Sequence, residues 1–275
     1  VAGARGKKLP LDAPICLATI QTMSERASEL PREFIRRWGL VVFDEAHHVS
    51  ARVFCRAADL FYGKRLALTA TPNRSDGLEH IYQYHLGPVF YRDTEQDLKL
   101  KLILLHVELD DADEATGDDV AVKTWLSQNR QFNQIVVNEV RAAIKKGRKV
   151  LALSHRVEQL STLRDMLGDG RVISGATPLR ERRDALMNGN PVWGSMQLAR
   201  EGLDRPELDT LLQITLFSNE NDFDQAPGRI LRQHDGKKPP VGVFLVPNIR
   251  RCQHQAARLK KYARQRGYEI EEHRI

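Results

Sequence analysis

Two adjacent acids, Asp44 and Glu45, follow a short apolar run from Leu40 to Phe43. The run predicts a strand buried on both faces, and open α/β sheets bind ligands at the carboxyl ends of their strands. At such an edge one carboxylate can hold a Mg²⁺ that bridges phosphates, and the other can position an attacking water. The tetrapeptide Asp44-Glu45-Ala46-His47 also suits an ordinary acidic turn, so the neighbouring segments decide between the two interpretations.

A second buried strand, from Lys64 to Leu68, is followed by the hydroxyls of Thr69 and Thr71. These hydroxyls come about two dozen residues after the acids, a distance that fits one βαβ crossover. If the two strands are neighbours, the threonine hydroxyls can hydrogen-bond the turn that carries the acids.

An earlier strand is expected over Ile15 to Ile20, with Thr19 and Gln21 at its end. Small polar groups in that position can meet a backbone phosphate, but they are equally suited to cap an ordinary strand. The sequence leaves these alternatives open.

The second half of the chain carries two further candidates. The loop Arg200–Asp204 places the flexible Gly202 beside two acids, although an ordinary polar loop has the same composition. Arg229 and Arg232 are three apart in a predicted helix over 223–231 and would share one face. Such arginines can reach a phosphate site in a neighbouring domain, or they form a solvated basic face.

Strands alternate with helices through both halves, which predicts an α/β fold of two domains with mainly parallel sheets. We place the first domain at 1–95, an acidic linker at 96–120 and the second domain at 121–275, and we expect the second domain to fold from near Ala121. Its expected elements include strands at 149–154, 172–174, 192–195, 211–216 and 241–246 and a long terminal helix at 249–266.

The chain of 275 residues has 42 basic and 36 acidic side chains and a net charge of +6. This balance leans weakly toward polyanionic partners. The terminal helix holds many of the cations, and we interpret it as a solvated basic face rather than a reader of sequence. Three distant cysteines form neither a disulfide framework nor a CxxC metal pair, which favours a reducing, cytoplasmic compartment.

Taken in order, these segments resemble the superfamily 2 helicases and translocases, and most closely the XPB-like repair helicases and their phage relatives. The resemblance covers nearly the whole chain. The segments similar to the family's motifs Ib, II, III, IV, IVa, V and VI are, in that order, Thr19/Gln21, Asp44–His47, Thr69–Thr71, Ser154–Arg156, Ser174–Thr177, Glu201–Asp204 and Gln225–Arg232.

The resemblance implies two RecA-like domains with ATP and Mg²⁺ between them and nucleic acid, DNA more readily than RNA, across both. Asp44 would hold the Mg²⁺ and Glu45 would activate water, with Arg229 and Arg232 as arginine fingers. Gly202, Asp204 and Gln225 would line the nucleotide site. His47, Thr69 and Thr71 would couple that site to nucleic acid. The phosphate backbone would be contacted by Thr19, Gln21, Arg156 and Thr177. Binding would be backbone-led and sensitive to salt.

Two features depart from the family's pattern. Ser195 stands where the family usually has a threonine before motif V. No GxxxxGK[ST] phosphate loop occurs, and Gly6-Lys7-Lys8 lacks the hydroxyl that should follow. We therefore expect the chain to be a fragment that begins partway through the first domain, and to show no nucleic-acid-stimulated ATPase by itself.

Three hypotheses follow from these observations. The chain is part of an ATP-driven nucleic-acid motor, a catalytically inactive binding module, or the motor part of a larger repair, phage, restriction or nuclease assembly. The presence of both acids and both arginines favours an active parent protein, because an inactive module has no physical need for them.

Overall fold

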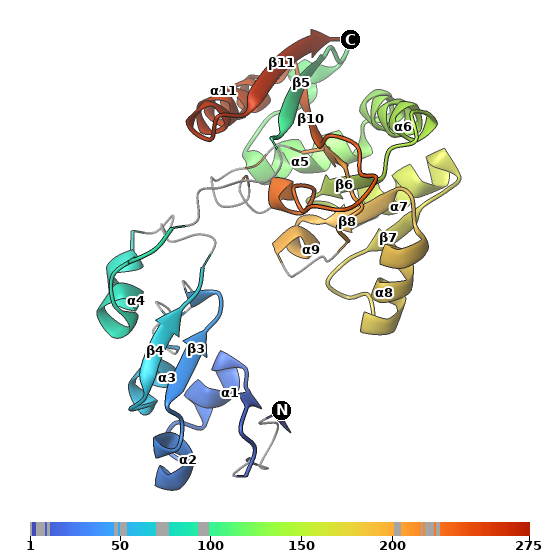
Figure 1. Ribbon diagram of the computed structural model, residues 1–275. Helices are drawn as coiled ribbons and strands as arrows, with labels where there is room; N and C mark the ends of the chain where they lie inside the picture. The colour runs from blue at the N-terminus through green and yellow to red at the C-terminus, as the bar shows by residue number, and fades with distance from the viewer. Residues whose placement is uncertain are drawn as a thin grey trace. The chain divides into compact units, whose positions relative to one another are not determined.

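The computed structural model describes residues 2–3, 9, 12–46, 49, 54–69, 77–92, 99–200, 205–215, 217, 223 and 226–275. The chain divides into two compact units, Val1–Thr94 and Glu95–Ile275 (Figure 1). A membrane crossing needs a long apolar helix, and the described part of the chain contains none.

Unit 1, Val1–Thr94, combines short parallel strand pairs with short helices. Strand β3 pairs with β4, and β1 pairs with β2. Its elements are β1 (Ala2–Gly3), β2 (Cys16–Leu17), α1 (Ile20–Glu25), α2 (Arg32–Arg36), β3 (Leu40–Phe43), α3 (Cys55–Leu60), β4 (Lys64–Ala67) and α4 (Glu79–Leu86).

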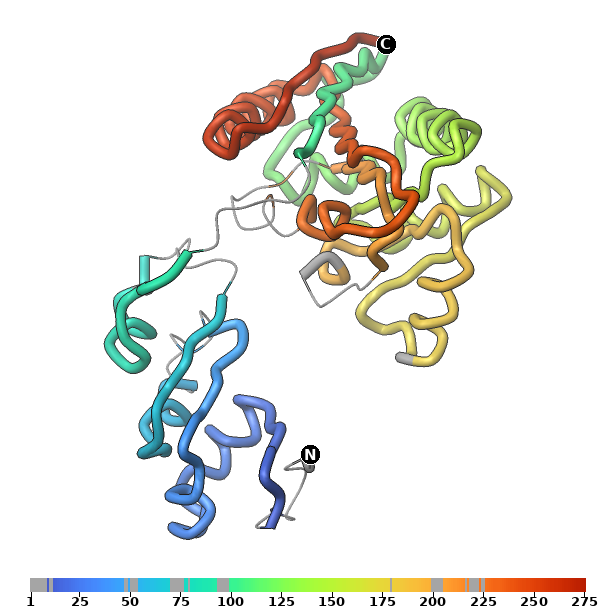
Figure 2. Tube along the Cα trace, viewed as in Figure 1, coloured from blue at the N-terminus to red at the C-terminus, as the bar shows by residue number. Residues whose placement is uncertain are grey.

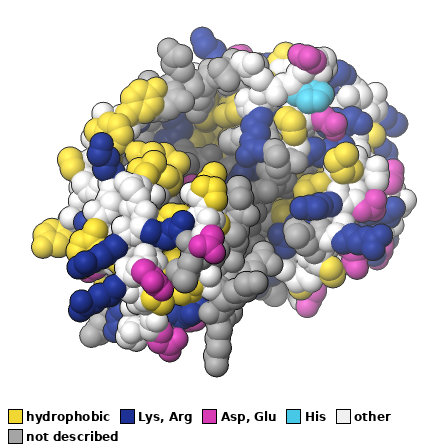
Figure 3. All heavy atoms as spheres, turned by 60° about the horizontal axis from the view of Figure 1, so that its bottom comes forward, with side chains coloured by type: hydrophobic (Ala, Val, Ile, Leu, Met, Phe, Trp, Pro, Cys, Tyr) yellow, Lys and Arg dark blue, Asp and Glu magenta, His cyan; other side chains and the backbone are white. Residues whose placement is uncertain are grey.

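Strand β3 is buried on one face only, which corrects the expectation of burial on both. Phe43 is 8% exposed and belongs to a core cluster with Ala58 and Tyr82, whereas Leu40 and Val42 are 56% and 49% exposed. Alternate residues of a strand point to opposite faces, and the described elements of unit 1 cover only the face that carries Phe43. Figure 3 shows hydrophobic side chains on the visible surface, and most of the exposed large ones belong to unit 1.

Unit 2, Glu95–Ile275, is built on one seven-stranded sheet in the order β11-β5-β10-β9-β6-β8-β7. Every pairing in it is parallel, so the carboxyl ends of its strands lie along one edge. The strands are β5 (Lys101–Val107), β6 (Val150–Ser154), β7 (Arg171–Ile173), β8 (Val192–Ser195), β9 (Thr210–Gln213), β10 (Val241–Pro247) and β11 (Glu269–Arg274).

Helices cover both faces of this sheet. The chain crosses the sheet in one direction from β5 to β7 and returns from β7 to β11, and right-handed crossovers place the helices of the two directions on opposite faces. Figure 1 shows α6 and α11 on opposite sides of β5 and β10. The helices are the 3-10 helix η2 (Ala112–Glu114), α5 (Asp119–Gln128), α6 (Arg130–Lys145), α7 (Val157–Leu167), α8 (Leu179–Asn188), α9 (Met196–Arg200) and α11 (Arg250–Gln265).

The second unit begins earlier than the sequence predicts. Strand β5 lies inside the expected linker, 96–120, and pairs with both β10 and β11. Its Leu102 and Leu104 are fully buried, so this stretch belongs to the core of unit 2. Strand β11 is absent from the sequence-based expectation, and Figure 2 shows it, in red, running beside β5.

Candidate functional site

The acidic turn of unit 1 is held by the backbone of the neighbouring strand. Leu68, just after β4, donates its N–H to the carbonyl of Phe43 at 2.9 Å and accepts from the N–H of Ala46 at 2.9 Å. The two acids lie between these bonds, and Asp44 Oδ1 accepts from the N–H of Glu45 at 3.0 Å. The turn that carries the acids is therefore clasped at both ends by a single residue.

Glu45 has a backbone φ of 49° and is the non-glycine residue with positive φ in the described part of the chain. A residue with a side chain pays a conformational cost in this left-handed region, and such strained residues cluster at functional sites. The clasp from Leu68 maintains the conformation. This observation motivates a functional role for the Glu45 carboxylate.

Strands β3 and β4 are parallel neighbours. This adjacency is the condition for the threonine hydroxyls to reach the turn that carries the acids. Thr69 follows Leu68 directly and is half-buried. His47 and Thr71, the other two residues predicted to couple the sites, lie outside the described residues.

Thr19 begins a helix and does not end a strand, which corrects the sequence-based assignment. Strand β2 stops at Leu17, and Thr19 is the N-cap of α1, where its Oγ1 accepts from the N–H of Thr22 at 3.2 Å. Gln21 lies in the first turn of this helix, and both side chains are exposed. Of the alternatives left open, the structure shows Thr19 in a capping role.

In unit 2, a chain of buried polar side chains fixes the segment that follows β6. Ser154 Oγ donates to Gln159 Oε1 at 2.7 Å, and Gln159 Nε2 donates to Asn133 Oδ1 at 2.9 Å. All three are almost fully buried. Ser154 Oγ also accepts from the N–H of Arg156 at 3.1 Å, so this network sets the position of the turn from Ser154 to Arg156.

Arg156 is engaged by the protein itself. Its guanidinium donates to the carbonyl of Val120 at 3.0 Å and to Thr124 Oγ1 at 2.7 Å, both on α5. Its neighbour His155 contacts Thr215 Oγ1 through Nδ1 at 2.7 Å. The sequence places His155 in the motif IV segment but gives no sign of its contact with Thr215, because nothing in either segment indicates that β6 and β9 are adjacent.

Thr177 closes a turn at the start of α8. Its Oγ1 accepts from the N–H of Ser174 at 2.9 Å, and its own N–H donates to the Ser174 carbonyl at 3.1 Å. Arg182 of α8 donates to the carbonyls of Ser174 and Gly175 at 3.3 and 3.4 Å. The predicted phosphate-contacting turn is thus a rigid one, braced by a helix with further arginines.

Arg229 and Arg232 do not share a helix face. Residues 226–228 are helical, Arg229 lies in the following turn and Arg232 lies beyond it. Arg229 is half-buried and Arg232 is exposed. Gly202, Asp204 and Gln225, the predicted nucleotide-lining residues, are outside the described residues.

Comparisons with known proteins find similarity to helicases and to restriction enzyme subunits. The sequence model of the family described as Type III restriction enzyme, res subunit, matches residues 4–74. Helicase D10 of Escherichia phage T5 is 25% identical over 87% of this chain and 55% of its own length. The DNA 3'-5' helicase XPB of Kineococcus radiotolerans is 28% identical over 93% of this chain and 49% of its own. A fragment described as the HsdR subunit of a type I restriction enzyme from Vibrio vulnificus matches with a TM-score of 0.70 at 16% identity, over 99% of this chain and 54% of that one.

The chain is similar to the superfamily 2 helicases. Its parallel α/β architecture is that of RecA-like helicase domains, as the sequence predicts. The chain spans about half the length of the relatives it matches.

Lys237 connects the last residue of motif VI to the segment that follows motif V, and the sequence gives no sign of this contact. Its Nζ donates to the carbonyl of Arg232 at 2.7 Å and to that of Pro206 at 2.8 Å. Partial burial is the largest effect on this amine and lowers its pKa. Lys237 therefore fixes the backbone at Arg232 against the segment that leaves motif V.

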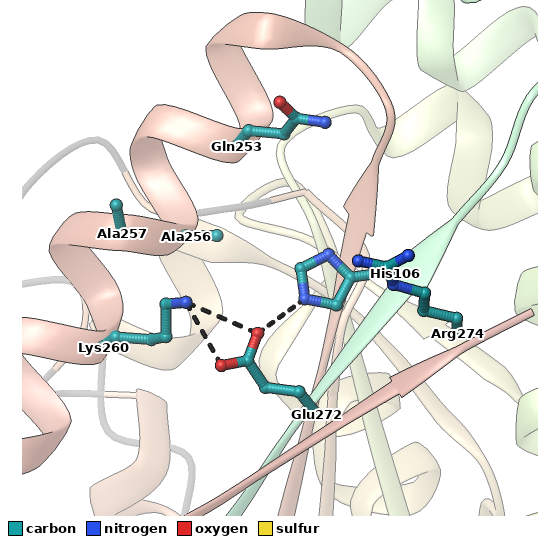
Figure 4. Close-up of a pocket in the computed structure, with 7 residues that line it drawn as sticks. All are labelled: His106, Gln253, Ala256, Ala257, Lys260, Glu272 and Arg274. Atoms are coloured by element: carbon teal, nitrogen blue, oxygen red, sulfur yellow. Dashed lines mark hydrogen bonds and ion pairs between the residues drawn. The ribbon is translucent and has the colours of Figure 1, made fainter.

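A cavity of about 450 Å³ beneath α11 lies outside the helicase motifs (Figure 4). In it, Glu272 of β11 accepts from His106 Nε2 at 2.8 Å and lies 3.2 Å from Lys260 Nζ. The hydrogen bond from His106, then that from Lys260, lowers the pKa of Glu272. This network joins β11 to β5 and α11, and the described residues contain no metal-binding cluster of His, Cys, Asp or Glu.

Proposed function

We propose that this chain is part of an ATP-driven DNA translocase of the XPB-like branch, in which hydrolysis at the acidic turn drives movement along nucleic acid. The observation that carries the proposal is the clasp of Leu68 around Asp44 and Glu45. It joins motif II to motif III through the backbone, so a shift at the acids displaces the strand end that carries Thr69. The name of one relative, a DNA 3'-5' helicase XPB, supports DNA as the substrate.

The residues of the acidic turn take separate roles in this proposal. Asp44 offers a carboxylate to the Mg²⁺ that accompanies ATP, and the ion would neutralise charge on the phosphates. Glu45, held in its strained conformation, positions the attacking water. Arg229 and Arg232 stabilise the charge that develops on the transferred phosphate.

The residues assigned to nucleic acid fall into two groups. One group would contact phosphates directly, and the other holds a motif in position. In this proposal Thr19, Gln21 and Thr177 contact phosphates, and it is supported by the exposure of Thr19 and Gln21 and by the hydrogen bond that fixes Thr177. Arg156 acts through its bonds to α5 and holds the motif IV turn in place. Contacts of this kind read the backbone and not the bases.

A role as the motor of a restriction assembly is the second candidate. Two observations favour it, namely the match of residues 4–74 to the type III restriction enzyme family and the fold shared with the HsdR fragment. Both candidates use the same ATP chemistry. They differ in whether translocation is followed by DNA cleavage.

Replacing Glu45 with Gln tests the hydrolytic role in the full protein that carries this chain. We expect ATP binding to persist and DNA-stimulated turnover to fall by roughly 10²-fold or more, because the amide cannot accept a proton from water. Binding would be followed with a fluorescent nucleotide and turnover by phosphate release, on single-stranded DNA and on RNA of the same sequence. Glu33→Gln, an exposed acid of α2, is the matched control. Unchanged turnover in Glu45→Gln would remove Glu45 from the mechanism, and stimulation by RNA alone would exclude the DNA assignment.

A further inference from the structure

A second cavity of unit 2, of about 520 Å³, opens beside the first turns of α11. It lies at the carboxyl edge of the sheet, since Asn248 lines it directly after β10. The segment from η2 to Gly117 and the side of α5 at Val122 complete the lining. None of these residues belongs to a helicase motif.

The charged lining of this cavity is predominantly cationic. Arg250, Arg251, His254 and Arg258 of α11 line it, together with one acid, Asp113. Within the described part of the chain, Arg250, His254 and Arg258 make no side-chain hydrogen bond or ion pair. Arg251 is held by a bond to the Gly117 carbonyl at 3.0 Å.

Two acids of α5 and its N-cap are engaged with other groups, which leaves Asp113 as the one carboxylate that lines the cavity against four basic side chains. Asp119 lies 2.7 Å from Lys123 Nζ and accepts from Gln255 Nε2 at 2.6 Å. Asp118 caps α5 by accepting from the N–H of Ala121 at 2.8 Å. The arginine forks of α11 are therefore available to an anion from outside.

The start of α11 adds to the positive potential. No side chain caps this 16-residue helix at Ile249, and uncapped N–H groups at a helix start carry partial positive charge. The effect is secondary to the three arginines, whose planar forks match phosphate oxygens in a bidentate manner.

The cavity is connected to the motif IV turn. Helix α5 supplies Val122 to the cavity and, at Val120, the carbonyl that accepts from Arg156. Only β9 separates β10 from β6 in the sheet, so the ends of these strands are roughly 10 Å apart at usual strand spacing. One nucleic-acid strand that passes the motif IV turn can reach the cavity.

We propose that this cavity binds a backbone phosphate of the nucleic-acid strand, as a contact beyond the helicase motifs. The inference rests on the proposed function, and it names a subsite for the substrate of that function. Arg250 and Arg258 grip the phosphate, and Arg251, tied to Gly117, shapes the wall. No Phe, Tyr or Trp lines the cavity, so we expect the contact to depend mainly on charge.

The test compares the full chain with a double variant, Arg250→Gln with Arg258→Gln. Binding of a fluorescent single-stranded oligonucleotide would be measured by anisotropy over a range of salt concentrations. We expect the Kd to rise roughly tenfold and the slope of log K against log salt to decrease by about 1 for each lost phosphate contact. Arg264→Gln, an exposed arginine of the same helix outside the cavity, should match the wild type.

Other outcomes overturn the proposal in distinguishable ways. If the double variant matches the wild type in affinity and salt slope, the cavity is not a nucleic-acid subsite and the proposed function stands. If the wild type itself binds no oligonucleotide, the proposed function fails and the subsite fails with it. If polyglutamate binds the wild type and not the double variant while oligonucleotide affinity is unchanged, the cavity takes an acidic protein segment. Paired Arg→Lys changes at 250 and 258, which keep the charge, should recover most of the affinity and exclude misfolding as the cause.

Discussion

At the scale of single residues, the chemistry of the site is set as much by backbone contacts as by side-chain identity. The types and spacing of Asp44 and Glu45 predict acids at a strand end, and the structure places them there. The clasp from Leu68 and the positive φ of Glu45 have no local sequence signal. A left-handed conformation at a glutamate depends on what holds it from outside the segment.

Lys237 provides a prediction at this scale. Its replacement by Met removes two bonds from a cationic donor to the carbonyls of Arg232 and Pro206. We expect the chain to lose about 1–3 kcal/mol of unfolding free energy and the full protein to lose ATP turnover while its nucleotide affinity is kept. Urea titration and steady-state kinetics measure the two effects.

Lys99→Met is the control for Lys237→Met. Lys99 is exposed and lines the same surface depression, but it has no side-chain bond in the described part of the chain. Equal effects of the two changes on turnover would show that general charge loss, and not the link between motifs V and VI, is responsible.

At the scale of elements, sequence periodicity locates most strands and helices of unit 2 but not their partners. The strands predicted at 149–154, 192–195 and 241–246 correspond to β6, β8 and β10. Strand β11 is missed because its sequence, Glu269–Arg274, is mostly charged. A charged strand at the edge of a sheet is stable when its side chains pair with neighbours, and it also protects the edge from other chains.

The pairing of β11 gives a prediction on pH. The hydrogen bonds from His106 and Lys260 lower the pKa of Glu272, so Glu272 binds fewer protons in the folded chain than in the unfolded chain. Its contribution is fully present above its ordinary pKa of 4.5 and is lost as the pH falls through the lowered folded value. We expect Glu272→Gln to reduce the unfolding free energy at pH 7 by less than about 1 kcal/mol, since the pair is partly exposed.

Unfolding of wild type and Glu272→Gln by urea at several pH values measures this contribution. The difference between the two proteins should shrink toward zero once the pH is well below 4.5. Glu269→Gln, on the same strand but outside this network, serves as the control. A difference that stays constant at acid pH would show that Glu272 stabilises β11 by packing alone.

At the scale of the whole molecule, the α/β class and the two-unit division follow from the sequence, but the boundary does not. The apolar run of β5 comes directly after unit 1 and before an acidic stretch. The local sequence pattern predicts a strand at this segment but does not indicate which sheet the strand joins. That choice is made by pairing with β10 and β11, which lie more than a hundred residues further along the chain.

The position of β5 predicts where unit 2 can be separated. A chain of residues 95–275 keeps β5 between β10 and β11, with Leu100, Leu102 and Leu104 fully buried, and should unfold in one cooperative transition. A chain of residues 121–275 lacks the central partner of β11 and exposes the apolar side of β10, so we expect it to lose cooperative unfolding or to aggregate. Circular dichroism melts and analytical ultracentrifugation distinguish the two chains. If 121–275 unfolds as cooperatively and at the same temperature as 95–275, β5 is dispensable and the boundary belongs near Ala121, as the sequence alone suggests.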